Sequence, residues 1–162
     1  MATRVFIHGL ESTSRGTKGL YFRERFPDMI IEDFSGELAE RMAKLRARLA
    51  DRTELILVGS SYGGLMAAMY ACENEAAVRR LVLLAPALDL EDFQPYRRCR
   101  LTLPVTLYHG SRDDVVSPDA VRAIAQEVFA NLTYHRVDDD HPLRDTFPTL
   151  DWETLLRDEF SA

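Results

Sequence analysis

The chain has 162 residues, of which 46% are hydrophobic and 28% are charged, as in an ordinary soluble globular domain with a substantial core. Its net charge of −6 argues against a nucleic-acid-binding protein, whose surface is expected to be basic. The sequence has no apolar run long enough to cross a membrane. We therefore expect one domain over residues 1–162, with no nucleic-acid partner and no membrane span.

The cysteine content favours a reducing compartment. Cys72 and Cys99 are too few and too separated for a disulfide framework or a zinc knuckle. The N-terminus enters a predicted strand almost at once, without a signal-peptide pattern. We expect free thiols, a cytoplasmic location, and neither a metal nor a cofactor, because no cluster of metal-ligating residues is visible.

The first third of the chain alternates between short strands and helices. Residues 5–7 predict a buried strand, followed by a glycine-containing loop over residues 8–12. Residues 17–26 are apolar at near-helical spacing, and the proline that follows ends this helix. A short strand over residues 29–31 precedes a long amphipathic helix, whose buried stripe consists of Leu38, Met42, Leu45 and Leu49.

The same alternation continues to the end of the chain. Further strands are predicted over residues 55–58, 81–85, 105–108 and 132–137. Further helices are predicted from residue 62 to about 72, over residues 119–129 behind Ser117 and Pro118, and over residues 151–160, with an irregular segment at 87–102. Because most strands are continuous apolar runs, we predict an α/β fold with a mainly parallel sheet covered on both faces.

A nucleophile motif joins the strand over residues 55–58 to the next helix. Residues 59–63 match G-x-S-x-G, in which one serine is held on a sharp strand-to-helix turn. Only Ser61 has glycine two residues away on either side, whereas Ser60 does not. A phosphate loop or a plain tight turn is the alternative, but the strand-then-helix context favours a nucleophile.

A serine nucleophile needs a neighbouring base, and four histidines are available. His8 and His109 each end a buried strand just before a glycine, which favours a bracing role for both. His135 lies inside a strand and is predicted to be partly exposed. His141 lies in a loop after the last strand, so it is the candidate base, with a solvated loop histidine as the alternative reading.

The acid that orients the base should follow a strand between the serine and the histidine. Asp113 and Asp114 satisfy this condition, although turn formation or helix capping would explain either one alone. The order Ser61, Asp113, His141 along the chain is the order expected when the nucleophile lies on a G-x-S-x-G strand-to-helix turn, called the nucleophile elbow. Three loops then offer the right residues in the right order.

These motifs make the chain resemble the α/β-hydrolase superfamily over nearly its whole length. The resemblance is carried by the segments at residues 8–12, 59–64, 109–116 and 140–141. The chain is most similar to small, lidless bacterial esterases and more loosely to acyl-protein thioesterase-like hydrolases.

The resemblance has several implications for the fold and the site. The family pattern H-G-x-x-D-x-x-V implies Asp113 as the acid, and the backbone N–H groups of Leu10 and Tyr62 as the oxyanion hole. The family usually begins with two extra antiparallel strands, so we expect a reduced sheet of about six strands in a three-layer α/β/α sandwich. The connection over residues 86–102 is short where many relatives carry a cap, which implies an open site.

The sequence therefore predicts a serine hydrolase that cleaves a small ester or thioester through an acyl-enzyme on Ser61. His141 is the predicted base and Asp113 its orienting acid, and the substrate is a small molecule or an acylated partner. A non-catalytic binding module with this fold, or an acyltransferase or amidase with the same triad, is the alternative. The basic run at residues 96–100 either binds an anionic substrate or is a solvated connector; the sequence gives no indication of oligomeric state.

Overall fold

The computed structural model describes residues 1–158, in which six strands form one sheet in the order β2-β1-β3-β4-β5-β6. Every neighbouring pair is parallel. The strands are β1 (Thr3–Ile7), β2 (Ile30–Ile31), β3 (Leu55–Ser60), β4 (Val78–Leu84), β5 (Val105–Gly110) and β6 (Leu132–Val137). The α-helices are α1 (Thr17–Arg25), α2 (Leu38–Leu49), α3 (Tyr62–Glu73), α4 (Pro118–Val128) and α5 (Trp152–Leu155). Short 3-10 turns are η1 (Glu75–Ala77), η2 (Glu91–Tyr96) and η3 (Phe147–Thr149).

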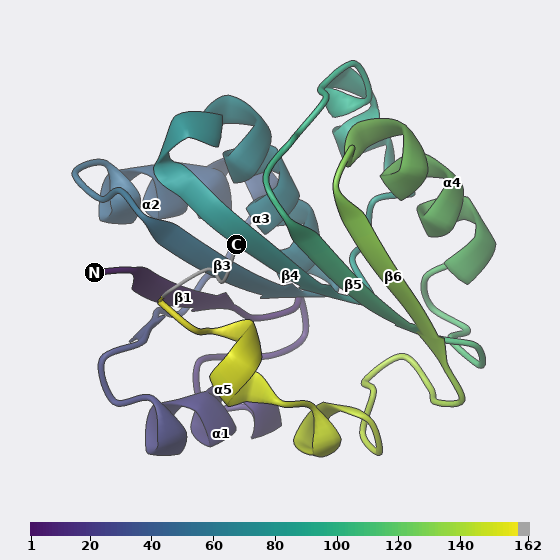
Figure 1. Cartoon of the computed structure of the whole chain (residues 1–162), viewed down its shortest axis with the longest axis horizontal. Coiled ribbons are helices and arrows are strands. Elements are labelled where there is room, and N and C mark those ends of the chain that lie inside the picture. Colours follow the sequence, from purple (N-terminus) through teal and green to yellow (C-terminus); the bar gives the residue numbers. More distant parts are fainter. Residues whose placement is uncertain (159–162) are drawn as a thin grey trace.

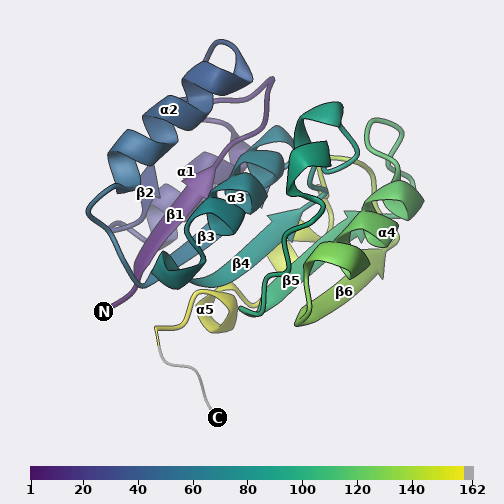
Figure 2. The same ribbon diagram turned by 90° about the horizontal axis from the view of Figure 1, so that it is seen from above.

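The helices cover the sheet from both sides. α2, α3 and α4 lie on one face, and α1 and α5 lie on the other (Figure 1). Seen from above, α2, α3 and α4 run side by side across the sheet, with α2 near β1 and α4 over β5 and β6 (Figure 2). The predicted three-layer sandwich with a mainly parallel, six-stranded sheet is confirmed, and every strand pairing is parallel.

Alternation along the central strands supplies the two cores. In β3, Leu55 and Leu57 pack into the cluster beneath α2, α3 and α4, whereas Ile56 and Val58 pack into the cluster on the α1 side. All four side chains are fully buried. A strand covered on both faces must be apolar at every position, which is why this run has no period-two pattern.

Most element boundaries lie within two residues of the sequence prediction, and two elements differ by more. β4 begins at Val78 rather than Leu81 and includes Arg79 and Arg80. The closing helix, predicted over residues 151–160, is the single turn α5, and the predicted part beyond residue 158 lies outside the described residues. The early end of α5 has a physical reason, because Arg80 Nη1 donates to the carbonyls of Thr154 and Leu155 at 3.0 and 2.7 Å. Those carbonyls would otherwise accept bonds from a continuing helix.

None of the helices within residues 1–158 combines the length and the apolar character needed to cross a membrane. Cys72 and Cys99 are both free thiols. The described part of the chain also holds no group of three or more His, Cys, Asp or Glu side chains arranged to bind a metal ion.

Candidate active site

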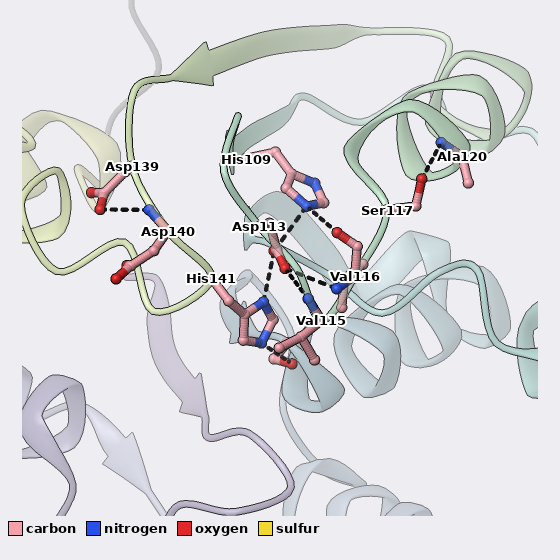
Figure 3. A network of polar contacts seen from close by, with 10 residues as sticks. His109, Asp113, Val115, Val116, Ser117, Ala120, Asp139, Asp140 and His141 are labelled. Atoms are coloured by element: carbon pink, nitrogen blue, oxygen red, sulfur yellow. Dashed lines mark hydrogen bonds and ion pairs between the residues drawn. The ribbon is translucent and has the colours of Figure 1, made fainter.

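Three of the residues singled out in the sequence meet at the carboxyl ends of the strands. Ser61 lies between β3 and α3, Asp113 follows β5, and His141 follows β6. The Oγ of Ser61 is 2.9 Å from Nε2 of His141. Nδ1 of His141 is 2.7 Å from Oδ2 of Asp113 (Figure 3). This is the geometry of a nucleophile, a base and an orienting acid.

The backbone at Ser61 is strained and held in place by its surroundings. Its φ of 55° and ψ of −114° are unusual for a residue with a Cβ. The Ser61 carbonyl accepts hydrogen bonds from the N–H groups of Gly64, Leu65 and Ala87, at 3.0 to 3.2 Å. Such a turn presents the serine side chain at the top of the sheet, as the G-x-S-x-G motif requires.

Asp113 has its carboxylate fully buried and saturated with hydrogen bonds. Oδ1 accepts from the N–H groups of Val115 and Val116 at 2.9 and 2.8 Å, and Oδ2 faces His141 and His109 (Figure 3). Burial alone would raise the pKa of Asp113, but the hydrogen bonds from Val116, His141 and Val115 outweigh it, so the pKa lies below its ordinary value. The carboxylate is therefore ionised and able to orient His141.

His109 takes part in the site in a way that the sequence did not specify. Its Nε2 donates to Oδ2 of Asp113 at 3.1 Å and to the carbonyl of Val116 at 3.2 Å. The ring is fully buried, and burial lowers the pKa of His109, which keeps it neutral. The bracing role expected for His109 is thus a hydrogen bond to the Asp113 carboxylate. The spacing of four residues between His109 and Asp113, across the turn at Gly110, is the feature of the sequence that could have indicated this contact.

The loop after β1 is fixed by His8. The Phe34 N–H donates to Nε2 of His8 at 2.9 Å, and Nδ1 donates in turn to the Gly9 carbonyl at 2.7 Å. Within residues 1–158, neither the N–H of Leu10 nor that of Tyr62 donates to another protein group. Both residues line the same cavity as Ser61, which makes their N–H groups the candidate donors to a ligand there.

The cavity above Ser61 has a volume of about 1200 Å³. Its lining is mainly apolar and aromatic: Phe6, Leu10, Tyr21, Ala87, Leu90, Val115, Val116, Pro142, Phe147 and Pro148. Charged side chains also border it, namely Glu11, Lys18, Asp89 and Arg144. A few polar groups in a largely apolar cavity are typical of a small-molecule site.

The basic run at residues 96–100 does not border this cavity. Arg97 forms a forked ion pair with Glu127 of α4, with N–O distances of 2.8 to 3.1 Å, and Arg100 donates to the carbonyls of Arg97 and Cys99. The idea that this run binds an anionic substrate is therefore replaced by the alternative, a connector tied to the protein surface. Sequence alone could not reveal the pairing with Glu127, which lies about thirty residues further along the chain.

Asp139 holds the loop that carries His141. It is buried, and its carboxylate accepts from the N–H groups of Asp140, Asp145 and Thr146 at 2.7 to 3.1 Å. Burial would raise the pKa of Asp139, but these hydrogen bonds outweigh it and the pKa lies below its ordinary value. Nothing in the sequence distinguished Asp139 from its two acidic neighbours.

Replacing Asp139 by asparagine should lower the free energy of unfolding by about 1–3 kcal/mol at pH 7, because an amide hydrogen then faces backbone donors. The lowered pKa means that the carboxylate stabilises the fold above the unfolded pKa of about 3.9, and that this stabilisation is lost as the pH falls through the folded value. Urea unfolding should thus show the difference at pH 7 and a smaller one near pH 3. Asp138→Asn is the matched control, since the Asp138 side chain is exposed and, within residues 1–158, pairs with Arg112 alone; it should change little at either pH.

With this geometry in view, comparison with known proteins defines the class. The family model described as alpha/beta hydrolase fold matches residues 8–103, more than half of the chain. The chain belongs to this family, which confirms the resemblance seen in the sequence. No curated protein matches the chain.

Solved structures agree with the fold at low sequence identity. A monoacylglycerol lipase from Paleococcus ferrophilus has a TM-score of 0.74 and 14% identity, over 96% of this chain and 94% of that one. An esterase from Pyrococcus furiosus gives 0.73 and 16%, over 96% and 80%. Alpha/beta hydrolase domain-containing protein 10 from mouse gives 0.72 and 20%, over 88% and 82%. At these identities the likeness establishes the fold.

Proposed function

We propose that this protein is a serine hydrolase that cleaves a small carboxylic ester or thioester through an acyl-enzyme on Ser61. The observation that carries the proposal is the unbroken hydrogen-bonded chain from Ser61 through His141 to the ionised Asp113, opening into a cavity. The lipase and the esterase among the structural neighbours support the same class of reaction.

The geometry supports a two-step mechanism. Nε2 of His141 accepts the Ser61 proton as Oγ attacks the substrate carbonyl carbon, and Asp113 stabilises the resulting imidazolium. The oxyanion that develops accepts hydrogen bonds from the N–H groups of Leu10 and Tyr62. His141 then gives its proton to the leaving alcohol or thiol. In the second step a water, deprotonated by His141, attacks the acyl-enzyme and releases the acid.

The two cysteines bear on the location of the protein. Two free thiols, Cys72 and Cys99, are consistent with the reducing conditions of the cytoplasm, and we include that location in the proposal. The substrate is then a small molecule or an acylated partner of that compartment.

A fluorophosphonate probe tests the proposed function directly. Intact-mass measurement should show one adduct on the wild type and none on Ser61→Ala, because only an activated serine is phosphonylated. The same substitution should lower turnover of short p-nitrophenyl esters by at least about 10³-fold.

Ser60→Ala is the matched control, since Ser60 is adjacent and also borders the cavity but lacks a contact with His141. Ser60→Ala should still form the fluorophosphonate adduct. A well-folded wild type that gives no adduct would favour a binding module, and an adduct without ester turnover would favour an acyltransferase or an amidase.

A further inference from the structure

Lys18 is a cation in the wall of the candidate active site. It lies in the first turn of α1 and borders the cavity together with Ser61 and His141. Its Nζ donates to the carbonyl of Pro142 at 2.7 Å and lies 5.4 Å from the centre of the Phe147 ring. Lys18 forms an ion pair with no carboxylate in residues 1–158.

The protein uses only part of the hydrogen-bonding capacity of the Lys18 ammonium group. This group has three N–H donors, and the protein supplies one acceptor, the Pro142 carbonyl. Burial lowers the pKa of Lys18, and the negative charges of Asp139 and Asp140 offset this only in part. Both carboxylates bind elsewhere: Asp139 accepts from three backbone N–H groups, and Asp140 pairs with Arg144 at 3.3 Å. Lys18 is half-buried, and its two remaining N–H donors can bind water or a ligand in the cavity.

Two anions, Glu11 and Asp89, and two cations, Lys18 and Arg144, border the cavity. Lys18 belongs to α1, and Arg144 lies in the segment leading to η3, whose Phe147 packs in the same core cluster as α1. Asp89 lies just before η2, which contacts α3. Arg144 pairs with Asp140 at 3.3 Å, whereas Lys18 has no ion-pair partner within residues 1–158. A negatively charged group in the cavity would therefore pair with Lys18 in preference to Arg144.

We propose that the substrate of this site carries a carboxylate in addition to its scissile ester or thioester, and that Lys18 binds this carboxylate. The inference rests on the proposed function and names its substrate class. A half-ester or half-thioester of a short dicarboxylic acid has this chemistry. Its carboxylate supplies the acceptors that the ammonium lacks, and its methylene chain lies against Tyr21 and Phe147. Lys18 is therefore a specificity-determining residue, and not a participant in bond breaking.

The test compares two p-nitrophenyl esters of similar length, the half-ester of glutaric acid and the neutral valerate. Lys18→Met removes both the charge and the contact with Pro142, whereas Lys18→Gln keeps an N–H donor for that carbonyl. Both variants should lower kcat/KM for the glutarate half-ester about 10- to 100-fold, chiefly through KM, the range given by a hydrogen bond to a charged group. For the neutral valerate, which has no second carboxylate for Lys18 to bind, the loss in kcat/KM should be much smaller.

Lys44 provides a matched control, because it is the other lysine of the chain and has similar contacts. Its Nζ donates to the Asp33 carbonyl and lies 5.6 Å from the centre of the Phe34 ring, yet it does not border the cavity. Lys44→Met should leave both esters unaffected. Equal losses on both esters in the Lys18 variants would overturn the proposal and reduce Lys18 to a brace for the His141 loop. An unchanged kcat/KM for the glutarate half-ester in the Lys18 variants would overturn it as well.

Failure of the proposed function gives a different result. In that case the wild type hydrolyses neither ester and does not react with the fluorophosphonate probe. Calorimetric titration with monomethyl glutarate, which requires no turnover, then decides the inference about Lys18. At least tenfold weaker binding to Lys18→Met than to the wild type and to Lys44→Met supports it, and equal affinity overturns it.

Discussion

Replacement of Asp113 by asparagine should lower kcat for a short p-nitrophenyl ester by about 10³- to 10⁴-fold while leaving the protein folded. The reason lies in the tautomer of His141. In the wild type the carboxylate accepts the Nδ1 proton, so Nε2 is free to accept a proton from Ser61. An asparagine with its oxygen toward Val115 and Val116 would present an NH₂ group to His141. Nδ1 then becomes an acceptor, Nε2 carries the proton, and the base is lost.

His109 makes the same substitution costly for stability. Its Nε2 donates to the oxygen of Asp113 that the NH₂ group would replace, and its Nδ1 is buried without a partner in residues 1–158. His109 can accept from the asparagine only by moving its proton to Nδ1, which gives up the bond to the Val116 carbonyl. We expect a loss of about 1–3 kcal/mol in the free energy of unfolding, which is too small to explain a loss of activity of this size.

The measurement combines steady-state kinetics with thermal unfolding of the same preparations. Asp114→Asn is the matched control, because Asp114 is the adjacent exposed carboxylate and makes no contact with His141. It should retain wild-type kcat within about twofold. Full activity in Asp113→Asn, or a large loss in Asp114→Asn, would show that Asp113 is not the residue that orients His141.

Much of the fold could be predicted because local patterns and tertiary demands agree. The run Leu55–Val58 is apolar at each position, and a strand at the centre of a covered parallel sheet is buried on both faces. The stripe on α2 is similar, since Leu38, Met42, Leu45 and Leu49 recur at helical spacing and pack against one core. The boundaries that differ, at β4 and α5, involve the contact of Arg80 with the carbonyls of α5, which is far away in sequence.

The candidate site also has a part that could be predicted from the sequence and a part that could not. The proximity of Ser61, Asp113 and His141 was predictable because each follows a strand, and parallel strands end at one edge of the sheet. The partners of His109, the hydrogen bonds of Asp139 and the cavity position of Lys18 were not, because each depends on how loops fold against one another. Loop conformation of this kind has no periodicity for a sequence pattern to report.

Among the glycines of the nucleophile elbow, Gly59, Gly63 and Gly64, replacement of Gly63 by alanine should destabilise the protein most. A Cβ at this position would lie 2.0 Å from the carbonyl oxygen of Ile7 and 2.6 Å from that of His8. These are backbone atoms at the end of β1, so they cannot rotate away as a side chain would. Relief requires α3 to move off β1, yet Gly63 to Ala71 are all buried in the core. We expect a loss of roughly 3 kcal/mol or more in the free energy of unfolding, equivalent to about 6–12 °C in Tm for a domain of this size.

The same displacement would affect catalysis, because β1 leads into the loop of Leu10 and α3 begins at Tyr62. A shift of about 1 Å in the position of reacting groups costs on the order of 10²-fold in rate, so activity should fall even in the fraction that folds. Calorimetry and ester turnover on one preparation measure both effects. Gly9→Ala is the comparison, since a Cβ there would meet the Ser60 carbonyl oxygen at 3.4 Å, and it should change the free energy of unfolding by less than about 1 kcal/mol. If Gly63→Ala were as stable as Gly9→Ala, the close approach of α3 to β1 would be incorrect, and with it the placement of Ser61 above the end of the sheet.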